Sequence, residues 1–299
     1  MLRRILLASA GAMALAGAAL AADLPSRAPP PVCLPPPPLF TWTGFYAGLN
    51  AGYTFGGGNS VDSETASGVA TSEQTLADAV AASATDVLSL RNSGFIGGGQ
   101  VGYNLQFANS WLAGIEADIQ GTGARGSAGA FRIVPIAGLP PTIAQAQSNI
   151  SVNNAVDYLG TVRGRLGVLV TPTLLIYGDG GFAYGGIHAG VDIVTTFPST
   201  GEGTSPAFGG FANTRPGWTA GGGLEWMFSP NWSVKAEYLY YDLGRVTFGV
   251  GGLTQTLFPA GPAFFTDLPV ASTRFNGNIV RAGLNYHFNW GPEPVVAKY

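Results

Sequence analysis

Charged residues, cysteine and long apolar runs are all scarce in this sequence. Only 10% of its 299 residues are Asp, Glu, Lys or Arg, whereas soluble globular domains carry about 25%. Cys33 is the only cysteine, which excludes an intramolecular disulfide and a cysteine-based metal cluster. A membrane-spanning helix needs about 20 consecutive apolar residues, and such a stretch occurs only at the N-terminus. The composition therefore fits neither a soluble domain nor a helical membrane protein.

The N-terminal apolar stretch has the layout of a secretory signal peptide. Arg3 and Arg4 precede the apolar run, and Ala19-Leu20-Ala21 matches an A-x-A cleavage site. We expect a signal peptide over residues 1–21, with an uncleaved anchor helix as the alternative. Once the two arginines are removed, twelve Lys and Arg face seventeen Asp and Glu, a net charge of −5. A nucleic-acid partner is not expected, because no basic cluster could neutralise its phosphates.

A proline-rich segment follows the signal peptide, over residues 22–40. Its LPSRAPPPVCLPPPPLF stretch cannot join a β-ladder and favours an extended polyproline II conformation. We expect a stiff periplasmic tether. Recognition of the prolines by a partner is the alternative.

Alternation of apolar and small polar residues begins at TGFYAGLNAGYTF, residues 43–55. Phe45, Leu49 and Tyr53 fall on one side of a strand, and the glycines fall on the other side. Glycine weakens a strand interior and often marks the close approach of another group. We therefore expect the polar side of this strand to face a crowded interior.

The same period of two recurs in seven further segments. We expect strands over residues 43–55, 94–107, 111–120, 158–170, 174–184, 218–228, 232–240 and 278–288. Three of their connections are tight turns, and the other four are long. Short connections at one end and long ones at the other are typical of an outer-membrane barrel with periplasmic turns and external loops. The sequence thus predicts an all-β fold, an eight-stranded antiparallel up-and-down transmembrane β-barrel over residues 41–288, with a C-terminal tail at 289–299.

The four long connections are rich in Gly, Ala, Ser and Thr. We expect them to be external loops. Loops of this length either carry recognition or form a disordered coat, and the sequence leaves both alternatives open.

Aromatic residues gather at the strand ends next to the short turns, where a membrane-interface girdle would lie. The expected girdle residues are Trp42, Phe107, Trp111, Phe228, Trp232 and Phe288.

Charged residues within the strands lie opposite the aliphatic ones. They are Glu116, Asp118, Arg163, Arg165, Asp179, Glu225, Lys235, Glu237 and Arg281. Five acids and four bases nearly cancel, and buried charges must be paired. Because an eight-stranded barrel is just wide enough to be filled by side chains, these residues predict a structural charge network that plugs the lumen.

Counting positions from the turns predicts individual pairs in this network. Glu116 and Asp179 should flank Arg165. By the same count, Asp118 should meet Arg163. Glu225 should meet Lys235 on the neighbouring strand.

Four motifs resemble one family of bacterial surface proteins. WTGFYAGLNAGY after the tether, LIYGDGGFAYG, WSVKAEYLYYDLG and the terminal VRAGLNYHF resemble the alphaproteobacterial outer-membrane immunogenic proteins, an opacity-like, porin-like β-barrel family. The resemblance covers residues 40–288. It implies eight strands, variable surface loops, assembly by the outer-membrane insertion machinery and mostly structural or surface-contact roles. Some relatives are associated with haem binding. One departure is the tail NWGPEPVVAKY, since relatives commonly end at the phenylalanine equivalent to Phe288.

The sequence offers little catalytic or cofactor chemistry. Gly97-x-Gly99-x-x-Gly102 has the spacing of a dinucleotide fingerprint, but that motif needs a helix after it and this one lies inside an expected strand. His188 and His287 fall at opposite ends of the barrel and cannot converge on a metal. We therefore expect no cofactor, no metal site and no catalytic residue.

His188 is expected to be a solvated residue at the rim of the barrel. Two alternative roles stay open. The family resemblance suggests a haem ligand. A set of His188, Asp192 and a loop serine would instead suggest a lipid-modifying enzyme.

These observations predict a non-enzymatic outer-membrane protein with a filled lumen and a structural or surface-contact role. A small passive channel for ions or solutes and a haem-binding surface protein are the alternatives. The expected partners are outer-membrane lipid and lipopolysaccharide, the outer-membrane assembly machinery, and host or envelope surfaces reached through the loops.

Overall fold

The computed structural model describes residues 40–56, 59–66, 74–137, 145–197, 204–257 and 263–288. The expected signal peptide, the tail and all of the tether except its last residue lie outside these residues. Among the described residues, no helix is long and apolar enough to cross a membrane.

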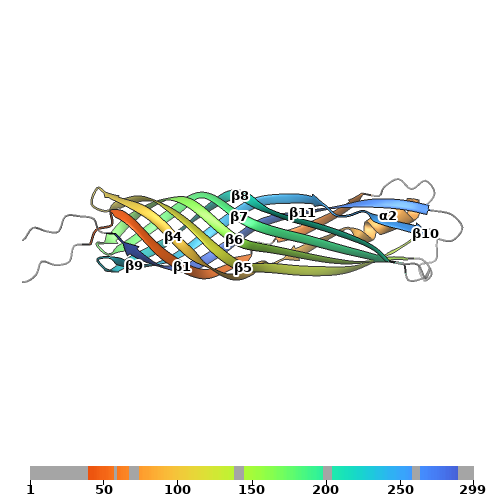
Figure 1. Cartoon of the computed structure of the whole chain (residues 1–299), viewed down its shortest axis with the longest axis horizontal. Helices are drawn as coiled ribbons and strands as arrows, with labels where there is room; N and C mark the ends of the chain where they lie inside the picture. The colour runs from red at the N-terminus through yellow and green to blue at the C-terminus, as the bar shows by residue number, and fades with distance from the viewer. Residues whose placement is uncertain are drawn as a thin grey trace, which may run out of the picture. The chain divides into compact units, whose positions relative to one another are not determined.

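Eight long strands form a closed antiparallel ring (Figure 1). In chain order they are β1 (Gly44–Gly56), β4 (Ser93–Phe107), β5 (Trp111–Pro135), β6 (Gln145–Thr171), β7 (Leu174–Thr196), β8 (Thr204–Ser229), β9 (Trp232–Gly249) and β11 (Ala263–His287). Each strand pairs with the next one, and β1 pairs with β11 to close the ring. The prediction of an eight-stranded up-and-down barrel is confirmed.

Three tight turns join the strands at one end of the ring. Ala108 and Asn109 adopt positive φ angles of 46° and 62° in the first turn. The turns also bond to the neighbouring hairpins, since the Leu169 amide donates to the Ser110 carbonyl and the Met227 amide donates to the Thr173 carbonyl. This end of the barrel is therefore a continuous hydrogen-bonded rim.

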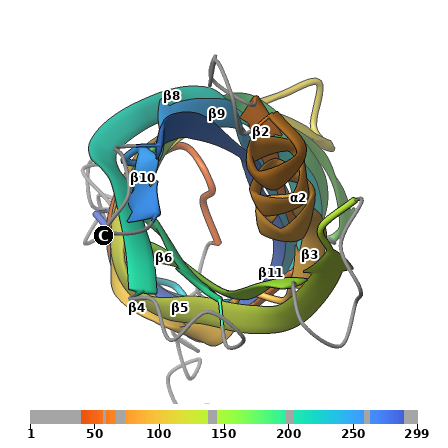
Figure 2. The ribbon, with the colours of Figure 1, turned by 90° about the vertical axis from the view of Figure 1, so that its right-hand side faces the viewer.

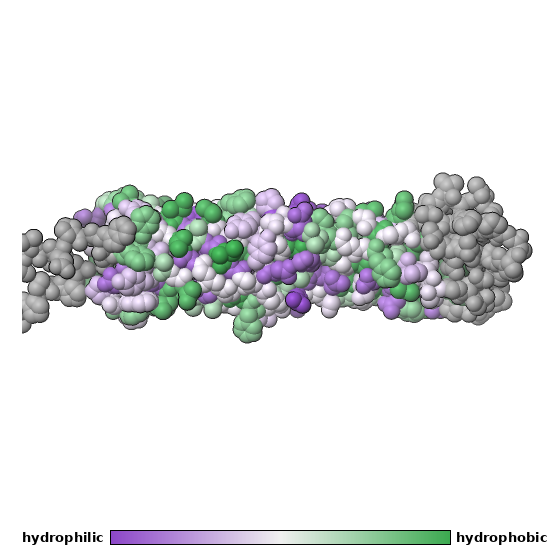
Figure 3. Space-filling view, viewed as in Figure 1, coloured by the Kyte–Doolittle hydropathy of each residue, from purple (hydrophilic) through white to green (hydrophobic). Residues whose placement is uncertain are grey.

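Near the turns, the strands expose apolar side chains and bury polar ones. Leu49 is 72% exposed, whereas Tyr46 and Asn50 on the same strand are at most 5% exposed. On the face shown in Figure 3, hydrophobic residues are frequent over the half nearer the short turns, and hydrophilic residues gather near the middle of the barrel. A lipid-facing outside and a polar inside are what a membrane barrel requires.

The inward glycines are required by the crowded lumen. A Cβ atom on Gly48 would lie 2.2 Å from the Asn285 side chain, and one on Gly52 would lie 2.6 Å from Arg281. Gly44 has a different reason, because its φ of +141° is a conformation that other residues rarely adopt.

Several strands are far longer than a membrane span requires, so the prediction of long external loops is wrong for much of those segments. β5, β6, β8 and β11 contain 25 to 27 residues each, whereas a membrane-spanning strand needs about 9–11. Ile150 and Val152 are buried in the outer part of β6. The outer half of the barrel therefore has the apolar inside of a water-soluble protein.

Smaller elements complete this outer half. They are β2 (Asn59–Ala66), α2 (Gln74–Ala84), β3 (Asp86–Leu90) and β10 (Leu253–Leu257). The antiparallel pair of β2 and β3, with α2 between them in the chain, extends the sheet from β11, and β10 pairs with the beginning of β11. Figure 2 shows α2 inside the ring of strands.

Helix α2 packs against the inner side of the outer half of the barrel. Ala77, Val80 and Ala84 are fully buried in the large apolar core of the outer half. The Ser83 hydroxyl lies 2.7 Å from the Ser148 hydroxyl of β6, which lies 2.8 Å from Thr195 of β7. The alternation in the sequence does not predict this helix, whose residues fall in one of the expected loops.

An ion pair joins β3 to β5 on the outer half. The Arg132 guanidinium donates two hydrogen bonds to the Asp86 carboxylate, at 2.6 and 2.9 Å. These bonds lower the pKa of Asp86 below its ordinary value.

Five of the six expected girdle aromatics are exposed near the turns. They are Phe107, Trp111, Phe228, Trp232 and Phe288. Trp42 is instead 1% exposed, and its indole nitrogen donates to the Pro172 carbonyl at 3.0 Å. The girdle prediction is wrong for Trp42, because this residue precedes β1 and its ring packs against the buried ring of His287.

Candidate functional site in the barrel lumen

The nine charged residues expected in the lumen lie on six strands and point inward. β5 supplies Glu116 and Asp118, β6 supplies Arg163 and Arg165, β7 supplies Asp179, β8 supplies Glu225, β9 supplies Lys235 and Glu237, and β11 supplies Arg281. Their side chains are at most 3% exposed. Alternation along each strand places them inside, because their neighbours in sequence face the lipid.

Arg163 is the centre of this charge network. Its guanidinium lies 2.5 Å from Glu116, 2.9 Å from Asp118 and 3.0 Å from Glu237. It also forms an ion pair with Asp179. One buried cation therefore contacts four carboxylates from three strands.

Lys235 and Arg281 neutralise the same carboxylates from the other side of the lumen. The Lys235 ammonium donates to both oxygens of Glu116, at 2.7 and 2.8 Å. Arg281 lies 2.9 Å from Asp118 and 2.5 Å from Glu237. Because these bonds join β9 and β11 to β5, they tie opposite walls of the barrel together.

Arg165 anchors the part of the network nearer the turns. Its guanidinium lies 2.6 Å from the Glu225 carboxylate and 4.1 Å from the centre of the Tyr177 ring. It also donates to the Tyr46 hydroxyl, which in turn donates to Glu116 at 2.6 Å. A cation held between a carboxylate and an aromatic face is stabilised by both.

Polar residues beyond the nine charged ones complete the network. Glu225 accepts hydrogen bonds from the Ser233 hydroxyl at 2.6 Å and from the Asn285 amide at 2.8 Å. His287 contacts the same Ser233 hydroxyl through its Nε2 atom, at 2.8 Å. All of these side chains are buried. Each has the strand phase of an inward residue, so that phase was the signal that could have identified them.

The predicted pairs are only partly those of the structure. Asp118 contacts Arg163 as expected, at 2.9 Å. Asp179 stands opposite Arg165 in the backbone register but forms its ion pair with Arg163. Glu225 stands opposite Lys235 in register, yet the ion pairs of Lys235 are with Glu116 and Glu237. Asp179 meets Arg163 diagonally on the neighbouring strand, whereas Lys235 reaches Glu116 across the lumen, so register alone does not determine the pairs.

Apolar clusters lie on both sides of the charges. Trp42, Leu112, Leu175, Tyr177 and Met227 form the cluster at the turn end. The large core around α2 forms the other cluster. Within the described part of the chain, no group of three or more His, Cys, Asp or Glu residues suits a metal ion.

His188 lies outside the lumen, on the exposed surface of β7. Its Nδ1 atom is 2.6 Å from an Asp157 carboxylate oxygen on β6. Asp157, and not the expected Asp192, is thus the acid beside His188. The role of His188 as a haem ligand stays a prediction.

Comparisons with known proteins agree with this architecture. The family described as "Outer membrane protein beta-barrel domain" matches residues 6–288. The 31 kDa outer-membrane immunogenic proteins of Brucella melitensis and Brucella suis are each 33% identical over 294 residues, which cover 96% of this chain and 100% of theirs.

One solved structure found by comparison is the outer membrane protein OprG of Pseudomonas aeruginosa. It has a TM-score of 0.36 and 13% sequence identity, and the match covers 84% of this chain and 99% of that one. The family of this chain is shown by the sequence matches alone. This chain belongs to the outer-membrane protein β-barrel domain family, together with the Brucella outer-membrane immunogenic proteins, and its location is the cell outer membrane.

Proposed function

We propose that this protein is a non-enzymatic structural barrel of the outer membrane that presents a rigid, folded surface outside the cell. The observation that carries the proposal is the filled lumen. Arg163, Arg165, Lys235 and Arg281 bind carboxylates from opposite walls, and apolar clusters lie on both sides of this network. Such a lumen favours mechanical stability over solute passage.

The outer half supports the surface-contact part of the proposal. Strands β5, β6, β7 and β8 run on from the membrane part and stay paired with one another, so the side chains exposed on them are held on an ordered wall. Phe131, Ile133 and Phe208 are exposed apolar residues on that wall. Exposed apolar residues outside the membrane favour contacts with a host surface or another envelope component. We also propose that the outer-membrane assembly machinery folds and inserts the barrel.

Conductance across planar lipid bilayers tests this proposal. Purified full-length protein should produce no steady openings of uniform size, because the lumen contains ion-paired side chains. A shift in electrophoretic mobility on boiling shows beforehand that the sample is folded. Steady openings of uniform size from folded protein would instead establish the alternative of a small passive channel.

A further inference from the structure

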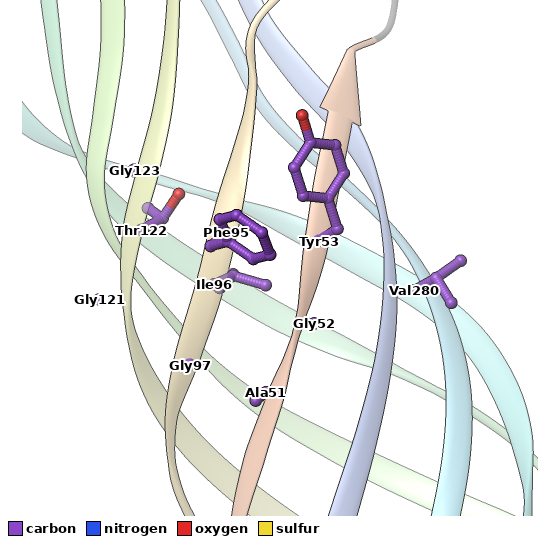
Figure 4. Close-up of a pocket in the computed structure, with 10 residues that line it drawn as sticks. All are labelled: Ala51, Gly52, Tyr53, Phe95, Ile96, Gly97, Gly121, Thr122, Gly123 and Val280. Carbon is purple, nitrogen blue, oxygen red and sulfur yellow. The ribbon is translucent and has the colours of Figure 1, made fainter.

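A groove of about 830 Å³ lies on the lipid-facing surface of β1, β4 and β5 (Figure 4). We name it the glycine groove and define it by Ala51, Tyr53, Phe95, Gly97, Gly121 and Gly123. Each of these residues has the outward phase of its strand. The Tyr53 and Phe95 rings pack against each other at 5.4 Å and stand over the ribbons, whereas the glycine positions are bare.

Packing inside the barrel does not explain these outward glycines. A Cβ atom on Gly121 would meet nothing within 4 Å, and one on Gly123 would lie 3.8 Å from its nearest neighbour. The inward Gly98 differs, because its Cβ would lie 2.0 Å from the Ile119 carbonyl oxygen. The outer wall therefore has room for side chains at Gly121 and Gly123, although neither residue has one.

The groove lies at the outer boundary of the membrane. Tyr53 is eight positions from Phe45, which is exposed near the turns, and about 9–11 residues span the bilayer. Arg125 is the next outward residue of β5 after Gly123. The backbone of Arg91 also reaches this place, since its carbonyl oxygen is 3.0 Å from where a Cβ of Gly126 would be. Both arginines are exposed, at the level of the lipid headgroups.

These two arginines differ from three other arginines of the outer half in having no acidic partner. Arg132 pairs with Asp86, Arg245 with Asp62 and Arg274 with Asp242. Within the residues that the structure describes, neither Arg91 nor Arg125 has a side-chain ion pair. An apolar groove therefore ends at two cations that are available to an anion.

We propose that the glycine groove binds an acyl chain of lipopolysaccharide, and that Arg125 and Arg91 bind a phosphate of the same molecule. Guanidinium groups suit phosphate because they form paired hydrogen bonds with it. A second copy of this chain fits less well, since a twofold contact through the groove would bring like-charged Arg125 side chains together. The proposal does not depend on the proposed structural role.

Native mass spectrometry of the full-length protein in detergent tests this site. The probe is bisphosphorylated hexa-acyl lipid A. Gly121→Leu fills the groove, and Arg125→Gln removes one cation without changing the groove. Gly164→Leu is the matched control, because Gly164 also faces lipid with nothing within 4 Å of its Cβ but lies on β6, away from the groove. Mobility before and after boiling checks the folding of each variant.

Lipid A should remain bound to the wild type and to Gly164→Leu. Binding should weaken about tenfold in Arg125→Gln, since a charge-assisted hydrogen bond contributes about 1.5 kcal/mol or more and 1.4 kcal/mol is a factor of ten. Gly121→Leu should also weaken binding, because its side chain occupies the place of the acyl chain. Lipid A without phosphates should bind the wild type about tenfold more weakly.

Three results would overturn the proposal. Equal effects of Gly121→Leu and Gly164→Leu would mean that the groove is not the binding site. Equal binding of lipid A with and without phosphates would remove the role of the arginines. A wild-type dimer that Gly121→Leu dissociates would mean that a second copy, and not a lipid, occupies the groove.

Discussion

At the scale of single residues, the direction that a glycine faces decides what it does. Inward glycines such as Gly48 and Gly52 give space to the side chains of the lumen, since their Cβ atoms would overlap neighbouring atoms. Outward glycines such as Gly121 and Gly164 have open space before them. The same residue type is therefore a packing requirement on one face and a surface feature on the other.

Replacing an inward glycine should cost far more than replacing an outward one. Gly52→Ala should lower the free energy of unfolding by about 1–3 kcal/mol, because overpacked cores lose roughly that much. Gly164→Ala should stay within about 0.5 kcal/mol of the wild type. Urea unfolding of both variants in lipid vesicles measures the difference, and equal costs would contradict the assigned phase.

Removing a single member of the charge network should cost more than removing an interacting pair. Arg165→Met leaves the Glu225 carboxylate buried without its arginine, at a cost of about 3–5 kcal/mol. Arg165→Met combined with Glu225→Gln should recover part of that loss. A double-mutant cycle in urea gives the coupling energy, and strictly additive losses would show that the two side chains do not interact.

At the scale of the strand, each long strand lies partly in lipid and partly in water. The part of β5 near the turn lies in lipid, and its outer part stands in water. Ile115 and Ile133 have similar exposures, 56% and 50%, although their surroundings differ. The strand keeps its outward phase along its length, so the medium outside determines which substitutions are tolerated.

The same substitution at these two positions of β5 should separate the lipid-facing part from the outer part. Ile115→Arg should cost about 2–4 kcal/mol, the range for an arginine near the bilayer midplane. Ile133→Arg should change stability by no more than about 0.5 kcal/mol, as for other exposed positions. Unfolding in vesicles provides both values, and similar costs would place the membrane boundary elsewhere.

The helix α2 should stabilise the outer half of the barrel without being needed for the membrane half. Val80→Asp places a charge in the apolar core, whereas Ala82→Asp alters an exposed position of the same helix. Proteolysis should cut the outer half of Val80→Asp faster and leave a protected membrane fragment in vesicles. Cleavage of both variants at the wild-type rate would mean that α2 does not support the outer half.

At the scale of the whole barrel, the sequence predicted the membrane half better than the outer half. Lipid requires apolar residues on the outward face, so the alternation around Leu49 and Asn50 identified a strand and its orientation. In the outer part of β6, Ile150 and Val152 point inward, so a search for apolar outward faces could not recognise that strand. Helix α2 was not predicted because its alanine-rich sequence lies between Ser- and Thr-rich segments, which are typical of loops.

The charged members of the candidate site were predicted, but its other members and some of its contacts were not. Inward phase identified every charged residue of the network. Individual ion pairs depend on how far a side chain extends across the lumen, and counting along strands gives no information on that. Lys235 contacts Glu116 across the barrel, although Glu225 is its neighbour in register.

Spin labels in lipid vesicles test most directly the claim that lipid surrounds the apolar face and paired charges fill the lumen. With Cys33 replaced by serine, single cysteines at Ala47, Val101 and Leu224 can carry the label. The structure predicts strong relaxation by oxygen dissolved in the bilayer and weak relaxation by a water-soluble nickel complex at all three positions. Strong relaxation by nickel and weak relaxation by oxygen would mean that these residues line an aqueous pore.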